Sequence, residues 1–160
     1  EAAMINIRAA TSADAKLIFD LIVELAVYEK APHEVVTDEN GISDSLFGPT
    51  ARAKALVCEV DGRAVGYAVY FYSYSTWLGR NGIYLEDVYV SPAFRGRGAG
   101  KALLRQLAQI AAAENCGRLE WSALDWNTPA IEFYEALGAQ AQSEWIKYRI
   151  SGDALRKLAE

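Results

Sequence analysis

The sequence predicts a mixed α/β protein with a central, mostly antiparallel sheet flanked by helices. Three observations predict this class. Strand-like apolar runs alternate with helical patterns along the 160-residue chain. Asp61-Gly62 stands between two such runs, and this dipeptide favours a two-residue turn between antiparallel strands. A glycine-rich stretch, Arg95–Lys101, separates a further strand from a long helix. A chain of this length can bury one core, so we expect a single domain over residues 4–160.

The N-terminal third is expected to hold one short strand and two helices. Ile5-Asn6-Ile7 has the character of a strand. A helix is expected from Thr11 to Tyr28, because threonine favours the N-cap position and apolar residues recur on one face. Thr37 is expected to cap a second helix, which runs to Phe47 and ends at Gly48-Pro49.

The middle third is expected to form an antiparallel meander. Strands over Ala55–Val60 and Arg63–Tyr74 flank the Asp61-Gly62 turn, and a loop over Ser75–Gly82 precedes a third strand, Ile83–Val90. Because short connections join antiparallel neighbours, these strands should form the centre of the sheet.

The C-terminal third should contain two further strands and three helices. Asn127 is a suitable N-cap, Pro129 suits a first helical turn, and Gly138 ends that helix. The expected elements are helix Gly98–Asn115, strand Arg118–Leu124, helix Asn127–Leu137, strand Glu144–Ile150 and helix Ser151–Ala159.

The glycine-rich stretch is the strongest functional signal. Its glycines alternate at a strand-to-helix junction, where the absence of Cβ atoms lets backbone N–H groups approach a ligand. Unpaired N–H groups and the positive end of the helix dipole favour an anion there, typically a phosphate. We therefore expect a pyrophosphate to be held by Arg95, Gly96, Arg97, Gly98, Ala99, Gly100 and Lys101.

Two common phosphate motifs do not fit this stretch. A P-loop needs a hydroxyl residue after its Gly-Lys pair, whereas Ala102 follows Lys101. A dinucleotide fingerprint needs G-x-G-x-x-G, whereas these glycines are spaced G-x-G-x-G. Arg95, Gly98 and Gly100 do match R-x-x-G-x-G, and the chain in this respect resembles the GCN5-related N-acetyltransferase (GNAT) superfamily.

A second motif strengthens this resemblance. Asn127, Ala130, Tyr134 and Gly138 reproduce N-x-x-A-x-x-x-Y-x-x-x-G, the other hallmark of the superfamily. The two motifs occur in the family's order, and the first three of these residues would share one helix face. The resemblance implies the GNAT fold and acetyl-CoA as cosubstrate.

Further segments resemble the diamine (spermidine/spermine, thialysine) acetyltransferase subfamily. They are Ile7–Thr11, Glu24–Glu29, Trp77–Gly79, Tyr84–Asp87 and Asp125–Asn127. This likeness implies acetyl transfer to a small primary amine by direct attack in a ternary complex, and commonly a homodimer.

The same resemblance implies the residues that hold the cofactor. Backbone groups at Val88, Tyr89 and Val90 would pair with the pantetheine arm like an added strand. The other side of the cofactor would be lined by Asn127, Thr128, Pro129 and Ala130, with Tyr134 also in contact with it.

It also implies the reactive groups. Tyr134 would be the general acid for the departing CoA thiolate, and Glu86 the general base at the amine, directly or through water. Glu86 is bordered by Leu85 and Val88, so we expect burial to raise its pKa. The amine pocket would be lined by Tyr28, Glu29, Trp77, Glu86, Glu120, Trp121 and Glu144.

One departure from the subfamily bears on the substrate. Relatives that act on polyamines usually carry an acidic residue just before the tryptophan segment. This chain has Ser75 there, in Tyr74-Ser75-Thr76-Trp77. Shorter amines, lysine analogues and amino-acid derivatives therefore remain open as acceptors.

The composition narrows the possible partners and the location of the protein. A net charge of −5 argues against a general nucleic-acid binder and suits a cationic substrate. No signal peptide and no apolar run of membrane-spanning length are recognisable, so we expect a cytoplasmic protein that does not bind membranes. Cys58 and Cys116 suit a reducing compartment as free thiols, and with the sole histidine, His33, they do not suggest a metal site.

Two other functions remain open. A protein or peptide N-acetyltransferase would need an open groove, whereas Trp77, Trp121 and Trp126 favour a narrow pocket. A non-catalytic acetyl-CoA-binding module would not need both Tyr134 and Glu86.

Overall fold

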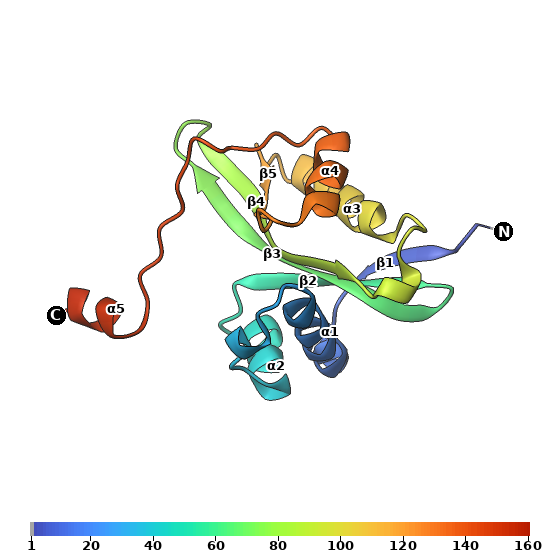
Figure 1. The fold of residues 1–160 in the computed structure, drawn as a ribbon, viewed down its shortest axis with the longest axis horizontal. Helices are drawn as coiled ribbons and strands as arrows, with labels where there is room; N and C mark the ends of the chain where they lie inside the picture. Colours follow the sequence, from blue (N-terminus) through green and yellow to red (C-terminus); the bar gives the residue numbers. More distant parts are fainter. Residues whose placement is uncertain (1) are drawn as a thin grey trace. The chain divides into compact units, whose positions relative to one another are not determined.

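Five strands form one sheet, in the order β1-β2-β3-β4-β5, in the computed structural model, which describes residues 2–160 (Figure 1). The first four strands pair antiparallel, and the fifth pairs parallel to β4. This arrangement confirms the predicted mixed, mostly antiparallel sheet. The strands are β1 (Ile5–Ala9), β2 (Ala53–Val60), β3 (Arg63–Ser75), β4 (Arg80–Val90) and β5 (Leu119–Glu120).

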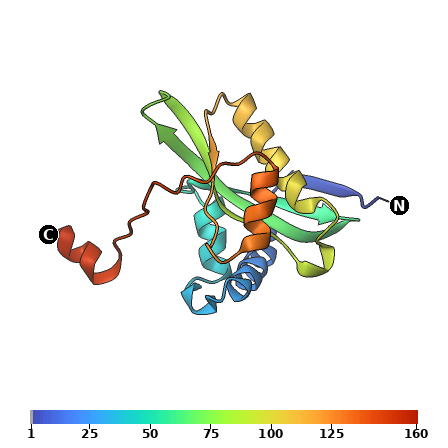
Figure 2. The same cartoon turned by 45° about the horizontal axis from the view of Figure 1, so that its top comes forward.

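Helices cover both faces of this sheet (Figures 1 and 2). α1 (Ala15–Tyr28) and α2 (Glu39–Phe47) lie against one face, and α3 (Ala99–Ala113) lies against the other. On the first face, Ile18 and other apolar residues of α1 pack against the sheet. On the second, α3 buries Leu103 and neighbours at helical spacing. These elements belong to the first of two compact units, which ends at Ser122.

Pairing shifts by one residue in the middle of β4. Asp87 lies opposite Val69, whereas Leu85 lies opposite Tyr70, the next residue of β3, so Glu86 is an extra residue. Such a β-bulge interrupts the alternation of side chains along the strand. Glu86 and Asp87 therefore both project from the face that carries Val69, which packs in the core beneath α1.

The two hairpin turns differ in how well the sequence predicts them. Asp61 and Gly62 both have positive φ, +50° and +82°, as a two-residue turn requires, so this prediction is confirmed. The loop expected over residues 75–82 is shorter, because β4 begins at Arg80. Gly82 lies inside the ladder opposite Ser73, where a Cβ would meet Ser73 Oγ at 2.8 Å. It permits close packing, and Gly79 supplies the positive φ of the turn.

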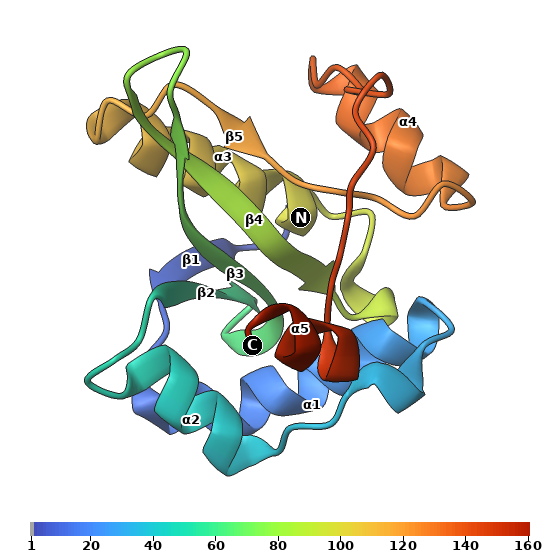
Figure 3. The ribbon, with the colours of Figure 1, turned by 90° about the vertical axis from the view of Figure 1, so that its left-hand side faces the viewer.

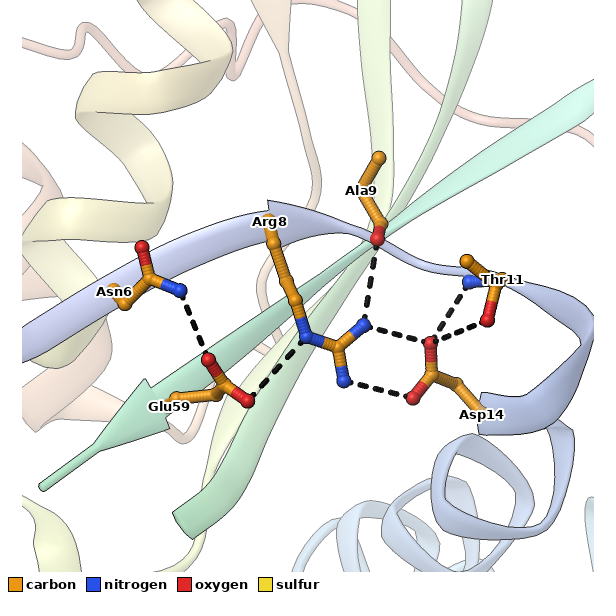
Figure 4. A network of polar contacts seen from close by, with 6 residues as sticks. All are labelled: Asn6, Arg8, Ala9, Thr11, Asp14 and Glu59. Atoms are coloured by element: carbon orange, nitrogen blue, oxygen red, sulfur yellow. Dashed lines mark hydrogen bonds and ion pairs between the residues drawn. The ribbon is translucent and has the colours of Figure 1, made fainter. Parts of the chain in front are cut away.

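A polar network joins β1 to the start of α1 (Figure 4). Arg8 donates from both terminal nitrogens to the two oxygens of Asp14, at 2.8 and 2.9 Å. Asp14 Oδ2 also accepts from the Thr11 backbone N–H at 2.8 Å. These contacts hold residues 12–14 in a 3-10 turn, so the α-helix begins at Ala15 and not directly after Thr11.

The network predicts an effect on stability. The Arg8 guanidinium holds the pKa of Asp14 below its usual value. We expect Asp14→Asn to lower the free energy of unfolding by about 1–3 kcal/mol near neutral pH, because a charge-assisted pair is lost. A carboxyl group whose pKa is lower in the folded than in the unfolded state stabilises the folded protein fully at pH values above its unfolded-state pKa of about 3.9. This stabilisation is lost as the pH falls through the folded-state pKa. Denaturant unfolding from pH 7 to pH 2 should therefore show the two proteins converging in acid.

Asp20→Asn is the matched control for this prediction. Asp20 pairs with Lys16 on the solvent face of α1, where both side chains are largely exposed. No measurable change is expected. A difference between Asp14→Asn and wild type that stays constant down to pH 2 would contradict the assigned linkage.

α2 begins one residue later than expected. Asp38 is its N-cap, because Asp38 Oδ1 accepts from the Gly41 N–H at 2.8 Å, and Glu39 is the first helical residue. The predicted cap, Thr37, lies outside the helix. The predicted end at Gly48 is confirmed.

The second compact unit, Ala123–Glu160, contains α4 (Thr128–Ala136) and α5 (Gly152–Leu158). Asn127 occupies the N-cap position of α4 and Gly138, with φ +98°, follows its end, as predicted. The prediction of a strand over residues 144–150 is wrong, because this segment pairs with no strand in the part of the chain that the structure describes. Alternating apolar residues form a strand only where another strand supplies hydrogen-bond partners.

The strand predicted over residues 118–124 is reduced to Leu119–Glu120. Its parallel ladder reaches only Ile83 and Tyr84 of β4 and ends just before the bulge at Glu86. The bulge accounts for the short strand, because it displaces the β4 backbone from a regular ladder. None of the helices in residues 2–160 combines the length and apolar character that a bilayer crossing needs.

Candidate active site

The glycine-rich turn forms the N-terminal end of α3. Gly98 is the N-cap residue with φ +88°, and Gly96 has φ +78°. A Cβ built at Gly96 or Gly100 would meet no atom within 4 Å, so the space beside the turn is open. Backbone N–H groups of the first helical turn lack partners within the helix itself. The turn thus fits the shape and polarity of a diphosphate.

The neighbouring edge of β4 is also open. Its ladder with β5 stops at Tyr84, so the β5-side edge of Val88–Val90 has no strand partner among residues 2–160. Figure 3 shows β4 continuing beyond the end of β5. An extended ligand could therefore pair with this backbone as an added strand would.

Arg95 connects the turn to α1. Its guanidinium lies 5.1 Å from the ring centroid of Tyr28 and 5.3 Å from that of Tyr89, within the range of cation–π contacts. Arg95 Nε also donates to the Val90 carbonyl at 2.9 Å. The side chain is therefore held between the end of α1 and the end of β4, while the neighbouring Arg97 stacks on Phe94.

An acidic group lies on the α1 face of β4. Asp87 accepts a hydrogen bond from the Tyr67 hydroxyl at 2.9 Å. Burial raises the pKa of Asp87, and the charge of neighbouring Glu86 raises it further. At the end of α1, burial and the charge of Asp87 raise the pKa of Glu29. We call Glu29, Glu86 and Asp87 the acidic group.

The partly buried carboxylate is not the one that the sequence predicts. Glu86 is exposed, and Asp87 is the partly buried member of the pair. The expectation that Glu86 is buried is therefore wrong, because the bulge turns Asp87 toward the core side where Tyr67 lies.

The second unit carries the remaining motif on α4. Thr128, Pro129 and Ala130 form its first turn, and Tyr134 lies one turn after Ala130 on the same face. The Tyr134 ring lies 5.7 Å from that of Phe133. Glu144 is exposed in a turn after the helix.

Comparison with known proteins identifies the family. The model of the Acetyltransferase (GNAT) family matches residues 19–139. The chain belongs to the GNAT family. It is an acetyl-CoA-dependent N-acetyltransferase.

Relatives match this acetyltransferase along nearly its whole length. A thialysine N-epsilon-acetyltransferase of Bos taurus is 41% identical, with 98% of each chain covered. An L-ornithine N5-acetyltransferase of Arabidopsis thaliana is 31% identical and covers 96% of this chain and 87% of its own length. Among solved structures, an integron cassette protein of V. cholerae has a TM-score of 0.82 at 28% identity, with 98% of both chains covered.

The structure of this acetyltransferase brings together only part of the expected site. Tyr28 and Arg95 are in contact, and Glu29 and Glu86 both neighbour Asp87. Trp77 lies in the β3–β4 turn and is 79% exposed. The seven residues from Arg80 to Glu86 alone span about 20 Å along the strand. Within the first unit, Trp77 is therefore remote from the acidic group.

The remaining expected pocket residues of the first unit lie at β5. Glu120 is the last residue of the strand and pairs with Tyr84, and Trp121 follows it. Both are half-buried. They lie at the level where the β4–β5 ladder ends.

Sequence reasoning missed three residues of this region. Tyr67 and Asp87 are joined by a hydrogen bond, and Glu24 accepts from Tyr89 and Ser91 hydroxyls at 3.2 and 3.0 Å. Asp87 follows the proposed base directly, but regular alternation would place it on the opposite face. Only strand register shows the bulge, so no local signal distinguishes Asp87 from Glu86. In residues 2–160, no set of acidic, histidine and cysteine side chains is grouped to hold a metal ion.

Proposed function

We propose that this enzyme transfers the acetyl group of acetyl-CoA to the primary amine of a small molecule of the diamine, polyamine or lysine-analogue type. The acidic group beside the open edge of β4 carries the proposal, because carboxylates attract the ammonium form of such an amine. The names of the relatives support it: they include acetyltransferases of thialysine and ornithine.

The residues of the chain would perform distinct tasks. Acetyl-CoA, when bound, supplies an acetyl group activated as a thioester. Backbone amides over residues 96–101 would hold the diphosphate, with the charge of Arg97 and Lys101 nearby. Val88–Val90 would pair with the pantetheine arm, and residues 127–130 would line its other side.

Proton transfer must accompany the reaction. Deprotonating an alkylammonium of pKa near 10.4 at pH 7 costs about 4–5 kcal/mol. Glu86 would accept this proton, directly or through one water molecule. The amine nitrogen would then form a bond to the acetyl carbon as the carbon–sulfur bond breaks, and Tyr134 would donate a proton to the sulfur. The second proton of the nitrogen, lost as the amide forms, would restore the Tyr134 hydroxyl through water.

The subfamily resemblance, and not proximity within this chain, makes Ser75 support a short acceptor, since Ser75 pairs with Arg80 about 20 Å along the strand from Glu86. The Ser75 hydroxyl accepts from the Leu78 N–H at 3.1 Å and so closes the β3–β4 turn. The carboxylate that polyamine-acting relatives usually carry at this position is therefore replaced by a group engaged in the turn. We propose lysine analogues and short diamines ahead of long polyamines.

A panel of amines tests the function directly. Release of CoA thiol should be fastest with thialysine, lysine, ornithine or putrescine, slower with spermidine, and absent with peptides. Activity on peptide N-termini alone would favour the protein acetyltransferase. Binding of CoA without turnover of any amine or peptide would favour a non-catalytic module.

We also propose a cytoplasmic homodimer. The family resemblance supports the dimer, as does the exposed apolar surface of the β3–β4 turn at Tyr74, Trp77 and Leu78. Free Cys58 and Cys116 support a reducing compartment. Light scattering should give twice the mass of one 17.6 kDa chain. A monomeric mass, or recovery in a membrane fraction, would contradict these proposals.

A further inference from the structure

A fully buried tyrosine holds one carboxylate of the acidic group. The Tyr67 hydroxyl donates to Asp87 Oδ2 at 2.9 Å, diagonally across the β3–β4 pair. Its side chain is 0% exposed and packs in the core with Ile18 and Val69. Because both residues stand on the central strands of the sheet, the hydrogen bond limits the orientations open to the carboxylate.

This hydroxyl is a permanent donor. Burial, followed by the charge of Asp87, raises the pKa of Tyr67 far above its usual value, so the proton stays on the oxygen at every working pH. A hydroxyl has one hydrogen and serves one carboxylate oxygen, whereas an ionised carboxylate has about four acceptor positions. Asp87 therefore keeps capacity for a second donor such as an ammonium group.

Asp87 has polar or charged neighbours on three elements, β4, α1 and β3. Glu86 neighbours it on β4, Glu29 faces it from the end of α1, and Tyr67 faces it from β3. Arg95, which follows β4, has its guanidinium stacked against Tyr28 and Tyr89. Removing the Tyr67 hydroxyl would favour protonation of Asp87, because that hydrogen bond lowers its pKa against the effects of burial and Glu86.

We propose that Tyr67 is a positioning residue for acetyl transfer, whose hydroxyl orients the Asp87 carboxylate toward the ammonium group of the incoming amine. The inference rests on the proposed small-amine function. It follows from the bulge, which places Asp87 on the same face as Glu86, directly before Val88–Val90, the stretch whose β5-side edge has no strand partner among residues 2–160. Glu86 then remains the exposed group that can exchange protons with water, while Asp87 binds the ammonium group.

Tyr67→Phe tests this role, because it removes the hydroxyl and keeps the ring. With the best amine of the panel, we expect the acidic limb of the kcat/KM profile to move to higher pH by roughly half to one unit, the equivalent of one ordinary hydrogen bond. KM for the amine should rise more than kcat falls. Asp87→Asn should remove the contribution of Asp87 to this limb and leave that of Glu86, and Tyr67→Phe should then cause no further shift.

Tyr72→Phe is the matched control. Its hydroxyl also bonds a carboxylate, that of Glu114, but on the α3 face of the sheet. Its pH profile should superimpose on that of the wild type. An unmoved profile in folded Tyr67→Phe, a shift of equal size in Tyr72→Phe, or a shift that persists in the Asp87→Asn background would overturn the inference.

Two further outcomes keep the test decisive. If Tyr67→Phe does not fold, the pH profile of Asp87→Asn decides the question alone. Asparagine at position 87 still offers the Tyr67 hydroxyl an acceptor, so this variant is expected to fold. A kcat/KM profile like that of the wild type would overturn the proposal. Failure of the wild-type enzyme to acetylate any small amine would instead refute the proposed function. Acetylation with an unmoved acidic limb refutes only the role of Tyr67.

Discussion

Tyr134→Phe is expected to lower kcat by roughly 100- to 10,000-fold while leaving the affinity for CoA nearly unchanged. The proposed role of Tyr134 is to protonate the departing sulfur, and phenylalanine cannot supply that proton. The substitution keeps the ring and its packing beside Phe133. Because the glycine turn and the β4 edge lie elsewhere in the chain, binding of CoA should not depend on this hydroxyl. Steady-state thiol release and calorimetric titration with CoA measure the two quantities.

Tyr148→Phe is the control for a tyrosine hydroxyl in the same unit. Tyr148 is 86% exposed and has no proposed role, so kcat should stay at the wild-type value. Wild-type turnover in Tyr134→Phe would remove Tyr134 from the mechanism. A large loss of CoA affinity in this variant would show instead that the hydroxyl binds the cofactor.

The second large effect is expected at the glycine turn. Gly100→Val should weaken CoA binding by roughly 10- to 100-fold, because its side chain would occupy the space where the diphosphate meets the backbone amides. A Cβ at Gly100 meets no protein atom within 4 Å, and its φ lies outside the left-handed region. The variant should therefore fold normally, as thermal unfolding without ligand would check.

A pair of alanine variants separates loss of binding from backbone strain. Gly98 and Gly62 have similar positive φ, +88° and +82°, and neither has a neighbour that an added Cβ would displace. Each alanine should cost about 1–2 kcal/mol of stability. Only Gly98→Ala should also lose affinity for CoA, because Gly62 lies in the β2–β3 turn. Equal CoA affinity in both variants, or wild-type affinity in Gly100→Val, would place the diphosphate away from this turn.

Local signals predicted most elements of the fold. Helix caps, glycines at helix ends and the Asp61-Gly62 turn act within a few residues, so their effects can be read along the chain. The failures lie where a strand depends on a distant partner. Residues 144–150 alternate as a strand should but pair with none in the described chain, and β5 stops where the bulge in β4 interrupts its ladder.

For the candidate site, the sequence by itself determined the family motifs, the glycine turn and the identity of the polar residues. These depend on backbone freedom and residue type, which are local properties. Only the tertiary structure decided that Asp87 is partly buried, that Tyr67 holds it and that Arg95 is stacked between Tyr28 and Tyr89. The reason is physical: a one-residue shift in pairing between β3 and β4 changes which face a side chain occupies, and that register is set by contacts between residues far apart in the chain.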